Sequence, residues 1–142
     1  VPVASTVAIQ PTSVGLSWLG ETTVVEATVR DQNGDAMGGV DLVWSSADAA
    51  IATVSEFGAV TARGDGTTVV TARVGAIIGT VSVSVARDVA TLLLGADSVV
   101  LADPGDDAAL MLFAADAGGA EISTAGVVWS SSDSTIVSDT LL

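Results

Sequence analysis

Short runs of alternating apolar and polar residues constrain the fold of this chain more than any other feature of its sequence. In residues 26–31 the apolar side chains of Ala27 and Val29 alternate with charged or polar ones, and the same period recurs in the runs at 40–46, 67–74 and 80–85. A period of two places alternate side chains on one face of a β-strand. Turn sequences such as Asn33-Gly34 separate the runs. About seven short strands of this kind predict an all-β chain that folds as an antiparallel β-sandwich.

The sequence also contains an internal repeat with an offset of 85 positions. The segment VWSSADAAI at 43–51 reappears as VWSSSDSTI at 128–136, so that Trp44 corresponds to Trp129. The same ungapped offset pairs many other identical residues, among them Thr6 with Thr91, Asp31 with Asp116 and Gly34 with Gly119. A unit of this length suits a small domain in tandem better than a solenoid repeat. We expect a complete domain at residues 1–86, the first copy, and a partial second domain at residues 87–142, the second copy.

Five blocks of the first copy carry a family resemblance: VAIQPTSVGL (7–16), LGETTVVEATVRDQNGD (19–35), VWSSADAAIATVS (43–55), GAVTARGDGTTVVTA (58–72) and VSVSV (81–85). Together they resemble the bacterial immunoglobulin-like domain, group 2 family, of intimin- and invasin-type surface proteins. The resemblance implies immunoglobulin-like sandwiches in tandem on a bacterial envelope protein. It also implies that Trp44 is the core tryptophan of the sandwich. The period of two places Trp129 on the inward face as well.

The second copy lacks counterparts of the blocks at 58–72 and 81–85. Half a sandwich leaves its apolar face uncovered and its strand edges unpaired. Three explanations stay open. The sequence is cut from a longer natural chain, the remaining strands exist but are missing from the structure, or a partner supplies the missing strands by β-augmentation. Truncation is the default expectation.

Composition excludes several classes of function. The chain carries 17 acidic residues against four arginines, a net charge of −13, and nothing basic follows Arg87. Such a surface repels phosphate backbones and anionic lipid, so we expect no nucleic-acid partner. Because His, Cys and Tyr are absent, the common general bases and metal ligands are missing, and we expect a non-catalytic protein without a cofactor. No run is long enough for a membrane helix, and no basic start precedes an apolar block, so any signal peptide is expected to be gone.

The tripeptide Arg63-Gly64-Asp65 is shared with extracellular ligands of integrins. It lies between two expected strands, where Gly64 and Gly66 would serve positive-φ positions and Asp65 the hydrogen bonds of a turn. A loop tip is also where an integrin ligand would present the tripeptide. We interpret it as turn chemistry and keep adhesion as the alternative.

Oxygen-rich loops raise the alternative of calcium binding. Asp31, Asn33 and Asp35 stand at alternate positions, as in the first half of a calcium loop, but the downstream bidentate Glu is absent. Asn33-Gly34 between two strands is itself a strong hairpin signal. The cluster Asp103-Pro104-Gly105-Asp106-Asp107 has the same ambiguity.

The connection at residues 86–95 has no Gly/Ser- or Pro-rich linker, so the two copies are expected to form a stiff rod. The favoured hypothesis is a structural or spacer module of a bacterial cell-surface or secreted protein, with neighbouring domains or other proteins as partners. A second hypothesis is an accessory subunit on the extracytoplasmic face of an envelope complex, with its incomplete copy completed by partners. A third is a module appended to a secreted polysaccharide-acting enzyme.

Overall fold

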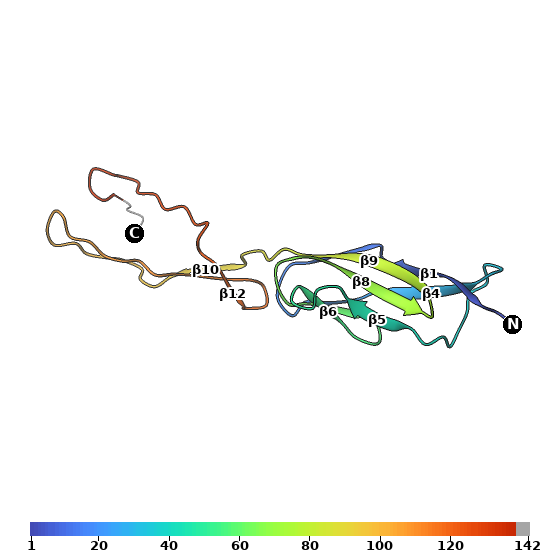
Figure 1. Cartoon of the computed structure of the whole chain (residues 1–142). Coiled ribbons are helices and arrows are strands. Elements are labelled where there is room, and N and C mark those ends of the chain that lie inside the picture. Colours follow the sequence, from blue (N-terminus) through green and yellow to red (C-terminus); the bar gives the residue numbers. More distant parts are fainter. Residues whose placement is uncertain (139–142) are drawn as a thin grey trace.

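The computed structural model describes residues 1–138, and its strands form two groups that lie end to end (Figure 1). Strands of the first copy are β1 (Ala4–Gln10), β2 (Ser13–Leu16), β3 (Thr22–Val24), β4 (Glu26–Asp31), β5 (Val43–Ser46), β6 (Ala52–Val54), β7 (Ala59–Ala62), β8 (Gly66–Val74) and β9 (Ile77–Val85). Those of the second copy are β10 (Thr91–Leu94), β11 (Leu112–Ala115) and β12 (Glu121–Ile122). The predicted all-β class is confirmed. None of the described residues belongs to a helix with the length and apolarity that a membrane crossing needs.

The first copy is a sandwich whose strands form two layers. One layer is the sheet β2-β9-β8-β5, and the other consists of β1-β4 and β3-β7-β6. The strands number nine rather than about seven because two extended segments are each split between two partners. The first breaks at Pro11, which has no N–H for a ladder, so that β1 pairs with β4 and β2 pairs with β9. The second breaks at Val25, so that β3 pairs with β7 and β4 with β1.

The core of this sandwich is built from small aliphatic side chains at alternate strand positions. Val70 and Ala72 of β8 face inward with Val81, Val83 and Val85 of β9. The opposite layer contributes the buried residues Val7, Ile9, Val25, Val29, Ala52, Val60 and Ala62. Burial of a valine side chain contributes roughly 1.5–3 kcal/mol, so the residues that alternate on the inward faces supply the main favourable contribution to folding of the sandwich.

The second copy repeats the strand register of the first copy where both partner strands exist. Val7 pairs with Val29 in the β1–β4 ladder, and the equivalent residues Leu92 and Ala114 pair in the β10–β11 ladder. β12 likewise repeats a bridge of the first copy. Residues 98–101, 107–109 and 128–131, which correspond to β2, β3 and β5, are not strands. In the first copy, β2, β3 and β5 pair with β9, β7 and β8, respectively. Residues 87–142 do not include positions equivalent to these three partner strands.

Candidate functional site

The segment between the copies is hydrogen-bonded along its length. Its backbone N–H groups at Ala86 and Asp88 donate to the carbonyl oxygens of Leu16 and Ser17, at 3.0 and 3.1 Å. Two residues later, the N–H of Ala90 donates to the carbonyl oxygen of the second copy's Ala115 at 2.9 Å. The connection is therefore tied to both copies rather than hanging free between them.

Arg87 forms hydrogen bonds with residues of both copies. Its backbone N–H donates to Asp65 Oδ1 of the first copy at 3.0 Å. Its side chain reaches the second copy, where Nε donates to Asp116 Oδ2 at 2.9 Å and Nη2 donates to the carbonyl oxygens of Ala120 and Glu121, at 3.0 and 2.7 Å. The side chains of Arg87 and Asp116 retain 12% and 0% of their exposure. A guanidinium with fixed donors suits this task better than a lysine ammonium would.

Asp116 serves the fold of its own copy and the contact with the other copy at once. Its Oδ1 accepts the backbone N–H groups of Gly118 and Ala120, both at 3.0 Å, and so closes the turn between β11 and β12. Its Oδ2 accepts Arg87 Nε and the backbone N–H of Leu19 from the first copy, the latter at 3.0 Å. We call this set of contacts among Leu19, Arg87 and Asp116 the junction.

The environment of Asp116 shifts its pKa. Burial acts to raise the pKa of this carboxyl, but the hydrogen bonds from Leu19, Arg87 and Ala120, with the charge of Arg87, outweigh it. The net result lowers the pKa to about 2 from an ordinary value of 3.8. Asp116 is therefore ionised at neutral pH and forms a charge-assisted contact with Arg87.

A glycine lets the first copy approach the turn of the second copy closely. A Cβ atom on Gly118 would lie 2.9 Å from Trp18 Cδ1 and 3.1 Å from the carbonyl oxygen of Leu19. The corresponding position of the first copy is Asn33. The exchange of a side chain for a hydrogen atom at this position allows the half-buried Trp18 to lie against the turn.

The integrin-like tripeptide lies between β7 and β8, as predicted, and borders the junction. Asp65 accepts the N–H of Arg87, and Arg63 and Gly64 both donate their backbone N–H to the carbonyl oxygen of Ile51, at 2.8 and 3.1 Å. The expectation of positive φ at Gly64 is wrong, since only Gly66, at 138°, adopts it here. Gly64 is required for a different reason: a Cβ there would lie 2.7 Å from the carbonyl oxygen of Ala50.

The candidate calcium loop is organised as a turn. Asp31 Oδ1 accepts the backbone N–H groups of Asn33 and Asp35, at 2.8 and 3.0 Å. In the second cluster Asp106 Oδ2 accepts the N–H groups of Ala102 and Asp103 in the same manner. Within residues 1–138, no three acidic side chains are arranged to hold a metal ion.

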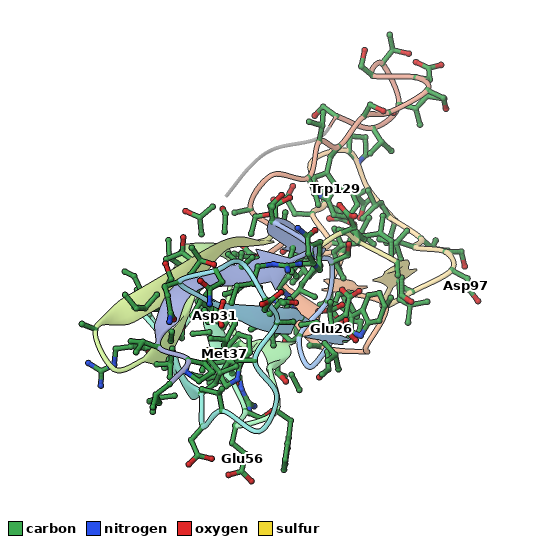
Figure 2. All side chains as sticks on the ribbon, turned by 90° about the vertical axis from the view of Figure 1, so that its right-hand side faces the viewer. Glu26, Asp31, Met37, Glu56, Asp97 and Trp129 are labelled. Atoms are coloured by element: carbon green, nitrogen blue, oxygen red, sulfur yellow. The ribbon has the colours of Figure 1, made fainter. Side chains whose placement is uncertain are left out.

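The two repeated tryptophans differ in their surroundings. Trp44 on β5 is half-buried, packs against the core, and forms part of an open groove of about 660 Å³. Glu26, Asp41 and Glu56 also line this groove, but Glu56 projects away from the ribbon (Figure 2) and the three do not form a metal-holding group. Trp129 is half-buried in a segment that is not a strand.

Sequence reasoning missed Arg87 and Asp116 as functional residues. One signal was available, because Arg87 is the last basic residue before a long acidic stretch and sits in the connection itself. The role of Leu19, whose backbone N–H makes the contact, carries no signal in its side chain.

A known domain family matches the central part of the first copy. Residues 27–76 match the model of the intimin immunoglobulin-like domain. The predicted resemblance is confirmed. No curated protein matches the chain.

Solved structures extend this comparison to surface-layer proteins. Domains 4 and 5 of the S-layer protein SbsC are 27% identical, with a TM-score of 0.54, over 61% of this chain and 54% of that structure. Domains 5–6 of SbsC are 25% identical, with a TM-score of 0.54, over 87% of this chain and 67% of that structure. The Escherichia coli adhesin FdeC is 20% identical, with a TM-score of 0.47, over 82% of this chain and 43% of that structure. The chain is thus an immunoglobulin-like module similar to domains of surface proteins. It spans about half of the SbsC structure of domains 4 and 5.

Proposed function

We propose that this chain is a non-catalytic spacer of an extracytoplasmic bacterial protein, in which two immunoglobulin-like domains, residues 1–86 and 87–142, are held in a fixed relative orientation. The junction is the observation that carries this proposal. Arg87 bonds to the first copy through its backbone and to the second copy through its side chain. A buried ionic contact with additional hydrogen bonds favours one geometry over others, because these donors and acceptors are all paired only when the two copies keep this arrangement.

The shape of the molecule and its similarities agree with a spacer. The two copies lie end to end (Figure 1), so that a fixed junction extends the reach of the chain. The chain is also similar to tandem domains of the S-layer protein SbsC. A net charge of −13 keeps such a β-rich surface from associating edge to edge.

Distance measurements between spin labels test the fixed orientation. The chain has no cysteine, so Arg73→Cys on β8 and Leu93→Cys on β10, both exposed, give one labelled pair. A fixed junction predicts a narrow distance distribution, which Arg87→Ala broadens. The matched control is Arg30→Ala, since the Arg30 side chain donates within the first copy, to the carbonyl oxygen of Gly34 at 2.9 Å. A broad distribution in the unaltered chain would refute the spacer proposal.

One observation favours the second hypothesis, an accessory subunit of an envelope complex. Large apolar side chains of the second copy are exposed, including Leu92, Leu94 and Val100. A subunit that is completed by a partner would present such a surface before assembly. Co-purification of the chain with a membrane complex from its host would support this role over the spacer.

A further inference from the structure

The second copy exposes apolar residues whose equivalents in the first copy are buried. Leu92 and Leu94 of β10 are 57% and 52% exposed, whereas their counterparts Val7 and Ile9 are 9% and 4% exposed. Val99 and Leu101 are 43% and 39% exposed, against 5% and 2% for Val14 and Leu16. Leu110 is also exposed, at 43%, whereas its counterpart Val25 is 1% exposed. We call Leu92, Leu94, Val99, Leu101 and Leu110 the open face.

The first copy shows what covers these positions. β2 pairs with β9 in parallel, so that Val14 lies beside Val83 and Leu16 beside Val85. β1 packs against both β9 and β8, and Trp44 of β5 pairs with Ala72 of β8. The antiparallel hairpin β8–β9 therefore provides both the ladder partners and the apolar cover.

The second copy is already arranged to receive such a hairpin. β10 and β11 hold the same register as β1 and β4, which fixes one wall of the sandwich. Residues 98–101 keep the alternation of β2, with Val99 and Leu101 in place of Val14 and Leu16. These residues lack only a strand to pair with.

We propose that the open face is the docking surface for a β-hairpin of the β8–β9 type: two antiparallel strands with valine or alanine at alternate positions, one of which adds in parallel to residues 98–101. The partner is thus a polypeptide segment recognised by backbone pairing and by small apolar side chains. This inference rests on the second of the two proposed functions and does not depend on the stiffness of the junction.

A peptide with the sequence of residues 66–85 tests this docking on the full chain. Hydrogen exchange at the amides of Val99 and Leu101 reports strand addition, and saturating peptide is expected to slow it at least about tenfold. In a first control peptide, Val81→Asp and Val83→Asp place charge on the inward face and abolish the protection. In a second, Ser82→Asp and Ser84→Asp place the same charge on the exposed face of β9 and leave the protection in place.

A covalent version guards against aggregation of the free peptide. A duplicate of residues 58–86 appended directly after Leu142 preserves the offset of 85 positions and brings the hairpin to the open face. Protection of Val99 and Leu101 in this extended chain, lost on Val→Asp changes at its inward positions, supports the proposal. It is overturned if neither version protects these amides, if the inward Asp variants protect equally, or if protection arises without a hairpin through concentration-dependent self-association. The spin-label distribution across the junction is a separate readout, so failure here leaves the spacer proposal standing.

Discussion

Asp31 and Asp116, 85 residues apart, close the same turn in the two copies, but Asp116 also holds the neighbouring copy. Each uses Oδ1 to accept two backbone N–H groups of its turn. Asp116 Oδ2 in addition accepts Leu19 and Arg87 of the preceding segments. One repeated turn has thereby become a contact between copies through the addition of Arg87 and the loss of a side chain at Gly118.

Acid is expected to release the junction. The pKa of Asp116 is lowered from 3.8 to about 2, so the ionised form is favoured when the junction is formed. The stability that ionised Asp116 gives to the junction is fully present above pH 3.8, the ordinary pKa of this carboxyl, and is lost as the pH falls through about 2. The distribution of spin-label distances should stay narrow at about pH 5 to 7, roughly one unit or more above the ordinary pKa of 3.8. It should broaden as the pH approaches about 2.

Asp116→Asn provides the control for this titration. Asparagine cannot ionise and does not pair with the charge of Arg87, so the variant should show a broad distribution that acid does not broaden further. A wild-type transition centred above 3.8 would show that another group controls the junction.

Adding a methyl group at Gly118 should loosen the junction without changing any charge. A Cβ would approach Trp18 Cδ1 to 2.9 Å, and the two copies must separate to admit it. Gly118→Ala is expected to speed hydrogen exchange of the Leu19 amide about tenfold, or ~1.4 kcal/mol. Gly126→Ala is the matched control, because a Cβ there meets nothing within 4 Å. Equal exchange in both variants would contradict the close packing of Trp18.

Much of the fold followed from the sequence because alternation acts locally. The inward faces of β4, β8 and β9 were predicted from a period of two, and their residues are buried as expected except for Ala27 and Val74, which are half-buried. The tandem repeat was visible because Trp44 and Trp129 retain their spacing. The split of single segments into β1 with β2 and β3 with β4 was not predicted, since it depends on which distant strand each half meets.

The junction was beyond sequence reasoning for a similar reason. Arg87, Leu19 and Asp116 come together only because the second copy turns its β11–β12 end toward the first copy. Likewise, Gly64 is needed for its approach to Ala50, which no local turn rule reveals. Contacts between segments far apart in sequence leave no periodic signal.

A Cβ at Gly79 should destabilise the first sandwich itself. It would lie 2.5 Å from the carbonyl oxygen of Val7 and 2.9 Å from Val7 Cγ1, where β9 crosses β1. Gly79→Ala is expected to lower the free energy of unfolding by ~2 kcal/mol, as overpacking of a well-filled core does. Urea denaturation measures this against Gly38→Ala, whose Cβ meets nothing within 4 Å. Coincident midpoints for the two variants would be inconsistent with this packing.

Removal of calcium should leave the melting temperature unchanged. Asp31 Oδ1 is already engaged by the N–H groups of Asn33 and Asp35, so the turn is closed without an ion. Calorimetry with added Ca²⁺ and with a chelator checks this, and Asp31→Asn is the variant to compare. A melting temperature that rises with Ca²⁺ in the wild type alone would revive the calcium interpretation, since a ligand that binds only the folded state stabilises it.

Asp65→Glu should weaken the junction and leave cell attachment unchanged. The Asp65 carboxylate accepts the N–H of Arg87 at 3.0 Å, and an extra methylene displaces the accepting oxygen from that donor. Arg63 and Gly64 are bonded to Ile51, so the tripeptide is held against the sandwich rather than displayed on a free loop. Attachment of integrin-bearing cells to the immobilised chain and the spin-label distribution together separate the two roles. Attachment that falls in the variant while the distribution stays narrow would assign the tripeptide to adhesion instead, because the junction would then not need this carboxylate.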